Sequence, residues 1–214
     1  MNRTQTKLKR VSLAACLTIF SSIFASAQTA AVSSEAHQPE PNSASVSQSA
    51  APSEAEANRF YNLTKQAPYA LASGETDAAR SYAETLLKEA ERFPKNWNYG
   101  NAIHVAHLVL GHIALDAGDL KEAKKQLLEA GKTPGSAQLN TFGPNMLLAK
   151  SLLEKKENEA VLQYFELCAK FWKIENGKLI QWKTAVQNNE MPDFAANLIY
   201  QMEALHQKQK SAQS

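Results

Sequence analysis

The stretch LGHIALDAGDLKEAKKQLLEA, residues 110–130, decides the fold. Its apolar residues recur at helical spacing on both sides of Gly118, which predicts two helices joined by a tight turn. Gly118 supplies the left-handed conformation that commonly ends a helix, and Asp119 caps the start of the next one. Gly111 and Ala123 are small enough to let the two helices approach each other closely. The stretch therefore predicts an antiparallel helical hairpin.

The chain shows helical periodicity from Glu54 onward, and no part of it shows the alternation that is typical of a strand. We predict eight helices: residues 54–71, 76–93, 99–117, 120–130, 144–155, 158–174, 178–188, and a last one from Pro192 to about Leu205. The third helix is apolar around nearly its whole circumference, which indicates packing on several sides. Its neighbours each carry one apolar stripe. The pattern therefore predicts a central helix flanked by amphipathic ones.

Two weaker copies of the hairpin pattern flank residues 110–130. Small residues in their second helices recur as Ala79, Ala123 and Ala160, which lie 44 and 37 residues apart. On these residues, the chain from about 60 to 172 resembles the tetratricopeptide repeat. Residues 96–101 and 133–145 also resemble the corresponding parts of bacterial exported proteins of this kind. The resemblance implies an all-α fold: an antiparallel helix-turn-helix array of about three degenerate repeats. It also implies C-terminal capping helices, of which the helix around Trp182 is one.

The N-terminus has the three-part order of a secretory signal. A basic region without acidic residues, which ends at Arg10, precedes a largely apolar run from Val11 to Phe24. Ala25-Ser26-Ala27 then supplies the small residues that a signal peptidase accepts. We therefore expect residues 1–27 to be a signal peptide, cleaved near Ala27, and the protein to be exported as a periplasmic or secreted protein.

A competing signal lies inside this segment. Leu13-Ala14-Ala15-Cys16 resembles a lipobox, which would tether the protein through lipidated Cys16. Only two residues separate Arg10 from Leu13, too few for the apolar region that a signal needs before its cleavage site. A discarded Cys16 is the favoured interpretation, and a lipid tether stays open. The apolar run is too short, and too often broken by Ser and Thr, to predict a membrane span.

Composition divides the remaining chain into three parts. Residues 28–53 are rich in Ala, Ser, Gln and Pro, which predicts a disordered tether. Residues 54–207 form the predicted helical domain, and residues 208–214 a disordered tail. Four of the 23 basic residues belong to the signal, which leaves 19 against 21 acidic ones. Without a concentrated basic patch, no nucleic-acid partner is predicted.

The resemblance also implies a binding surface for a protein or peptide. In similar repeats, first-helix positions face a concave groove, and here they hold Val105, Leu108, His112 and Asp116, with Asn145 in the next copy. Leu108 and His112 stand where some relatives use Lys and Asn to grip a peptide carboxylate, which argues against that mode. The alternative is that these residues pack against a neighbouring helix. Self-association through an exposed end of the array also stays open.

An enzyme is the second hypothesis. His104 and His107 lie 60° apart around one helix and are adjoined by the loop 132–143, so a metal-dependent or unrecognised site there is conceivable. His112 points elsewhere, however, and the chain lacks the ligand spacing of zinc sites and the phosphate or nucleophile motifs of common enzymes. We therefore predict a non-enzymatic protein without a metal ion or cofactor.

Overall fold

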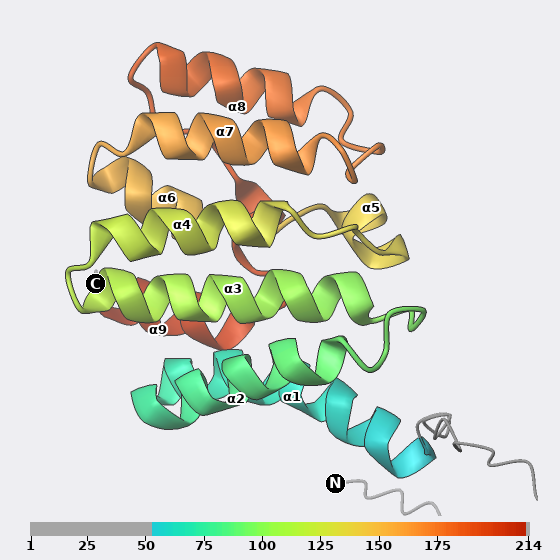
Figure 1. Ribbon diagram of the computed structural model, residues 1–214. Helices are drawn as coiled ribbons and strands as arrows, with labels where there is room; N and C mark the ends of the chain where they lie inside the picture. The colour runs from blue at the N-terminus through green and yellow to red at the C-terminus, as the bar shows by residue number, and fades with distance from the viewer. Residues whose placement is uncertain (1–52, 213–214) are drawn as a thin grey trace, which may run out of the picture. The chain divides into compact units, whose positions relative to one another are not determined.

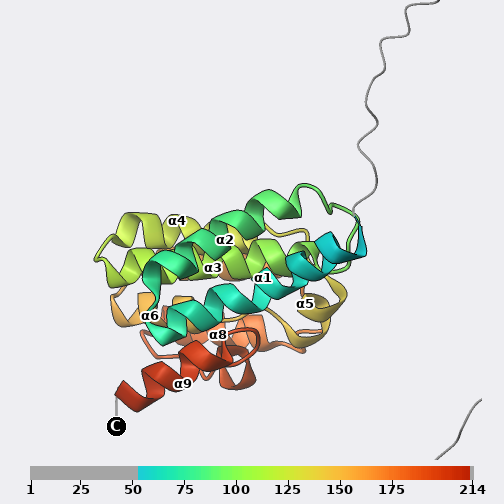
Figure 2. The same ribbon diagram turned by 90° about the horizontal axis from the view of Figure 1, so that it is seen from below.

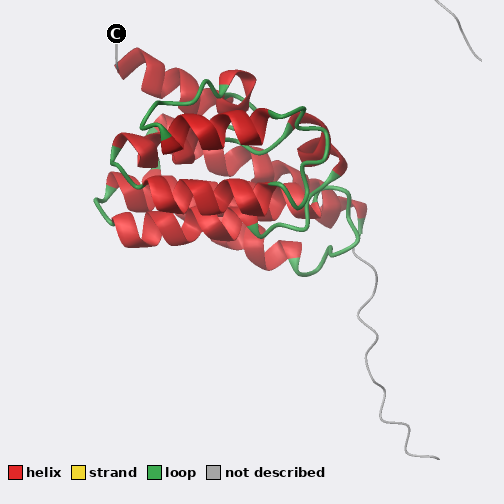
Figure 3. Cartoon of the chain, turned by 90° about the horizontal axis from the view of Figure 1, so that it is seen from above, coloured by secondary structure: helices red, strands yellow, loops and turns green. Residues whose placement is uncertain are grey.

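The computed structural model describes residues 53–212, and this part of the chain consists of helices joined by loops. In chain order the helices are α1 (Glu54–Ser73), α2 (Thr76–Ala90), α3 (Tyr99–Asp116), α4 (Leu120–Gly131), α5 (Ala137–Phe142), α6 (Leu147–Glu154), α7 (Asn158–Cys168), α8 (Lys178–Gln187), the 3-10 helix η1 (Ala195–Leu198) and α9 (Glu203–Ala212). Figure 3 shows no strand among them, so the predicted all-α fold is confirmed. The predicted signal peptide and nearly all of the predicted tether lie outside the described residues.

Three antiparallel hairpins, α1–α2, α3–α4 and α6–α7, stack along the array in Figure 1. Helix α3 lies at its centre and contacts α1, α2 and α4. Of its 18 residues, 13 are buried, as expected for the helix that is apolar all round. Helix α8 covers the far side of α7, where Trp182 lies 6.0 Å from Phe165 of α7 between ring centroids. These contacts confirm the predicted helical array and its C-terminal capping helix.

Local signals set several helix ends where they were predicted. The Asp119 side chain accepts a hydrogen bond from the backbone N–H of Glu122 at 2.9 Å, and Gly118 has φ 81°. Both ends of this turn therefore follow from residues adjacent in sequence. The capping box that Ser53 forms with Glu56 starts α1 in the same way.

The predicted loop 132–143 contains a short helix, α5, which the sequence did not reveal. Its N-cap is Ser136, whose hydroxyl accepts a hydrogen bond from the backbone N–H of Leu139. A second difference between the predicted and the observed helices is the end of α7, which lies at Cys168 and not at residue 174. Phe171 and Trp172 are both buried beyond it, and Asn140 accepts a hydrogen bond from the Lys173 backbone N–H. The chain leaves the helix to bury both rings.

The prediction of one helix from Pro192 to Leu205 is wrong. Ala195 and Gln201 have φ values of 44° and 62°, which interrupt the helical path on either side of η1. The first full helix of this region, α9, begins at Glu203 and continues to Ala212, through most of the segment 208–214 for which a disordered tail was expected. The cause is tertiary, because hydrogen bonds to the α5–α6 connection fix the backbone around Asn197.

Within residues 53–212, none of the helices combines the length and the apolar character that crossing a membrane requires. Cys168 is fully buried and forms no disulfide.

Candidate functional site

The first helices of the three hairpins, α1, α3 and α6, lie on one side of the array. In Figures 1 and 2, the C-terminal segment, defined here as residues 194–212, runs along this side. Helix α9 contacts α1, and a cleft of about 90 Å³ is shared by Leu147 of α6 and Gln209 of α9. The side of the array on which the sequence analysis predicted a partner-binding surface is therefore covered by the chain itself.

Side-chain amides hold the first half of the C-terminal segment to the α5–α6 connection. The Asn197 side chain donates hydrogen bonds to the carbonyl oxygens of Phe142 and Pro144, at 3.0 and 2.9 Å. The Asn197 carbonyl accepts one from the Met146 backbone N–H at 2.8 Å. Asn145 adds a bond from its side chain to the Tyr200 carbonyl, also at 2.8 Å. Backbone capture of this sort is how proteins commonly bind extended peptides.

Asn145 is itself positioned by a buried histidine. Its backbone N–H donates to His104 Nε2 at 3.2 Å, and the other ring nitrogen of His104, Nδ1, lies 3.0 Å from the Ala130 carbonyl. Because a carbonyl only accepts and a backbone N–H only donates, His104 is neutral with its proton on Nδ1. Burial lowers the pKa of His104 to about 4, although the bond to Ala130 opposes that shift. Helices α3 and α4 are thereby connected to the C-terminal segment.

The structure places four of the five predicted partner-binding residues in the interior. Val105, Leu108 and Asn145 have no exposed surface, and His112 is 2% exposed. Their environment matches the alternative in which they pack against neighbouring elements. Asp116 alone is exposed, at the end of α3; partial burial raises the pKa of its carboxyl group, and the nearby Lys208 ammonium opposes the shift.

His112 differs from His104 in lacking a partner for one nitrogen. Its Nε2 atom is buried without a hydrogen bond, and burial lowers the pKa of His112 to about 4. Asp116, four residues further along α3, is not among its hydrogen-bond or ion-pair partners in the described residues. His112 is thus a neutral core residue in this structure.

The residues of the enzyme hypothesis are engaged in structural bonds. Both nitrogens of His104 bind backbone groups, and His107 Nδ1 lies 2.7 Å from the Gln126 side-chain oxygen. In the loop, Asn140 binds the Lys173 backbone and Thr141 binds the Ala137 carbonyl. Residues 53–212 contain no group of three His, Cys, Asp or Glu side chains that could hold a metal ion.

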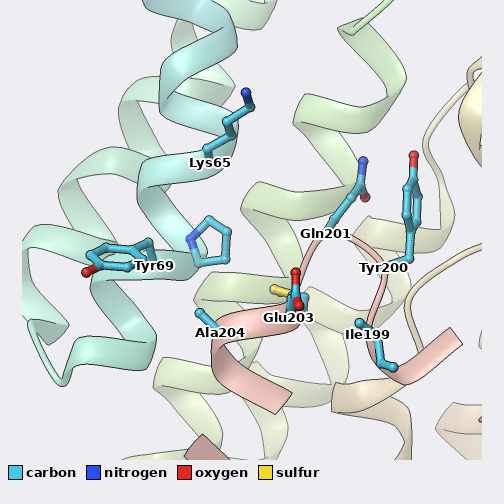
Figure 4. A pocket seen from close by; sticks show the side chains of 9 residues that line it. Lys65, Tyr69, Ile199, Tyr200, Gln201, Glu203 and Ala204 are labelled. Carbon is cyan, nitrogen blue, oxygen red and sulfur yellow. The ribbon is translucent and has the colours of Figure 1, made fainter. Parts of the chain in front are cut away.

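A pocket that the sequence did not predict lies where α1 meets the C-terminal segment. This junction pocket, of about 630 Å³, is lined by Lys65, Pro68 and Tyr69 of α1 and by residues 199–204. Figure 4 shows the two sides facing each other across the opening. Tyr69 and Ile199 are 66% and 41% exposed, which is unusual for such large apolar groups at one place. No local pattern identifies it, because its two walls are 130 residues apart in sequence.

The fold defines the class of protein as an all-helical array of antiparallel hairpins. No family matches the chain, and neither a curated protein nor a solved structure is similar enough to count as a match. Any functional conclusion therefore depends on the geometry of this chain.

Proposed function

We propose that this protein is an interaction or scaffold module that holds a protein or peptide partner along the first helices α1, α3 and α6. The observation that carries the proposal is that this side of the array already holds a polypeptide segment. Asn145 and the Met146 backbone N–H donate to the backbone carbonyls of Tyr200 and Asn197 in that segment, as a peptide-binding protein binds its ligand. The likeness of residues 110–130 to a tetratricopeptide repeat supports the same role, since such repeats use their first helices for binding.

The junction pocket provides the first contact site for the partner. Its wall combines apolar side chains with Lys65 and Glu203, and Tyr69 presents an exposed aromatic ring. Aromatic residues beside apolar pockets are frequent anchors of protein interfaces. Two of the five partner-binding residues expected from sequence have different roles in this proposal. Asp116 is accessible to a partner, whereas Asn145 holds the C-terminal segment from the interior.

We also propose that the module works outside the cytoplasm, because of the signal-like order of residues 1–27. N-terminal sequencing of the protein recovered from its own cells tests this. A mature chain beginning near Gln28 is expected, whereas a lipid-modified Cys16 would show that the protein is tethered. An intact N-terminus on all recovered protein would contradict export by cleavage.

Site-specific crosslinking tests the binding role. A photo-reactive residue is placed at Tyr69 beside the junction pocket, and in a matched variant at the exposed Lys121 on α4. We expect a discrete crosslinked partner from position 69 and none from position 121, in cells that produce the protein at its natural level. Identical crosslinking patterns from both positions, or none from either, would contradict binding along α1, α3 and α6. Substituting Leu108 is no test, because this residue is fully buried.

A further inference from the structure

The C-terminal segment is held unevenly along its length. In its first half, Phe194, Asn197 and Met202 are at most 1% exposed, and hydrogen bonds fix the backbone. In the ten residues of α9, Leu205 is the one that is buried. An element with so few buried apolar contacts opens at low cost in free energy. Helix α9 can therefore leave its place while residues 194–202 stay attached.

The contacting face of α9 fits its surroundings poorly. Positions 202, 205, 209 and 212 follow one another at helical spacing and share one face. Met202 and Leu205 are apolar and buried, but Gln209 stands next to Leu147 and Leu198 in the cleft described above, and Ala212 is small and exposed. The second half of this face thus places the polar Gln209 at a cleft that Leu147 and the half-buried Leu198 line, and it ends on the short side chain of Ala212.

The charges around the Lys208 side chain favour a cation at this position of α9. Lys208 Nζ lies 3.4 Å from the Leu71 carbonyl oxygen in the last turn of α1, and the Asp116 carboxylate attracts it from the end of α3. The C-terminal ends of helices carry partial negative charge, which adds to the attraction. We call the surface marked by Leu71, Asp116 and Leu147 the α9 seat.

We infer that the α9 seat binds an amphipathic helix of a partner protein, and that α9 occupies it only in the partner's absence. The inference rests on the proposed function and names the chemistry of its partner. The partner's helix carries apolar residues at the three positions equivalent to 205, 209 and 212, and a basic residue at the position equivalent to 208. Helices bind apolar grooves through anchors at this spacing. The α9 of a second copy would bring the same Gln and Ala, so it gains nothing over the chain's own.

The test uses a fluorescent peptide with the sequence of residues 203–212 and the substitutions Gln209→Leu and Ala212→Leu. It is titrated into the purified protein and into a Leu205→Asp variant, in which α9 loses its buried anchor. We expect affinity about tenfold higher for the variant, because the internal competitor is removed. A Gln207→Asp variant, changed at an exposed position of α9, should bind like the unaltered protein. A peptide carrying Leu205→Asp should not bind.

Two further measurements keep the result decisive. Circular dichroism shows whether Leu205→Asp disturbs the fold. If it does, Lys208→Glu replaces it, because this change weakens the attachment of α9 from an exposed position and should raise peptide affinity several-fold. Asp116→Lys should lower it in every background. Equal affinity of folded Leu205→Asp and Gln207→Asp variants would overturn the inference. Equal affinity of the unsubstituted peptide, with concentration-dependent dimers in sedimentation, would instead assign the seat to a second copy.

The outcome is separable from that of the crosslinking experiment. A partner crosslinked at position 69 together with a peptide that fails to bind leaves the proposed function standing and removes the α9 seat. Peptide binding without any crosslinked partner leaves the α9 seat standing and removes the proposed function.

Discussion

At the scale of single residues, two histidines of α3 differ in their hydrogen bonding. His104 binds a carbonyl group on one side and a backbone N–H on the other, whereas His112 Nε2 has no partner. Both are buried in neutral form. Sequence spacing put them on one helix and on different faces, but it did not predict their hydrogen bonds, because the groups that they meet come from other elements.

Replacing His104 with Leu should destabilise the protein by about 3 kcal/mol, since the Ala130 carbonyl and the Asn145 N–H would be buried without partners. Urea unfolding measures the loss. His107→Leu is the matched control on the same helix, where a half-buried ring loses one bond to Gln126 and less than about 1 kcal/mol is expected. An unchanged midpoint for His104→Leu would show that His104 does not hold the α5–α6 connection.

Acid should weaken the fold through the same two residues. Burial lowers the pKa values of His104 and His112 to about 4, so between pH 6.5 and 4 the unfolded chain binds more protons than the folded one. Stability is thus complete above pH 6.5 and declines as the pH falls towards 4. Each histidine should account for about 2 kcal/mol lost by pH 4.5.

Urea unfolding at pH 7 and pH 4.5 checks this. The variant His112→Leu removes one of the two groups together with its unsatisfied nitrogen, so it should be as stable as the parent at pH 7 and lose less on acidification. A pH dependence equal to that of the parent protein would contradict the assignment.

At the scale of elements, glycines set how closely neighbouring segments pack. Gly111 was predicted to let α3 approach α4, and a Cβ atom there would lie 3.2 Å from the Gln126 Cβ of α4. The tighter contact, 2.3 Å to a Leu148 side-chain carbon, is with α6. Gly100 was assigned no such role, yet its Cβ would fall 1.8 Å from the Gly135 carbonyl oxygen. Contacts between distant segments give both positions their importance.

Gly100→Ala should therefore cost more stability than Gly111→Ala. The first obstructs backbone, and it also disturbs the hydrogen bond from the Thr133 hydroxyl to the Gly100 carbonyl. The second meets the end of a side chain that can shift, and overpacking of that sort costs about 1–3 kcal/mol. Thermal melting of both variants ranks them. The reverse order would show that the loop before α5 yields more easily than the α3–α6 contact.

At the scale of the whole molecule, the C-terminal segment closes the side of the array that α1, α3 and α6 form. Asn145 donates to the Tyr200 carbonyl of this segment, and Asn197 of the segment donates to the Phe142 and Pro144 carbonyls beside Asn145, so their contributions should be coupled. Residues that share one network are not energetically independent. The closure of the array is thus a property of the network and not of either amide alone.

Asn145→Ala and Asn197→Ala should each destabilise the protein, and the double variant should lose less than the sum of the two. Hydrogen exchange adds a local measurement, in which amides of residues 194–202 should exchange faster in either variant. Ser151→Ala provides a control, because its hydroxyl binds a carbonyl within α6 and does not reach the segment. Additive losses with unchanged exchange would show that the two amides act separately.

Local chemistry was enough to predict much of this protein from its sequence. Gly118 and Asp119 mark the turn of the central hairpin, and the all-round apolar surface of α3 marks the centre of the array, because each signal acts on neighbouring residues. Tertiary structure, in contrast, determined that the C-terminal segment covers the first helices of the hairpins. Asn145 meets the Tyr200 carbonyl across 55 residues of chain. That pairing ties the chain before α9 to the α5–α6 connection and leaves α9 over the α9 seat. Packing of α3 against its neighbouring helices buries Val105, Leu108 and His112, three of the residues assigned to a groove. Periodicity describes which face of a helix is apolar, and only the folded chain determines what covers it.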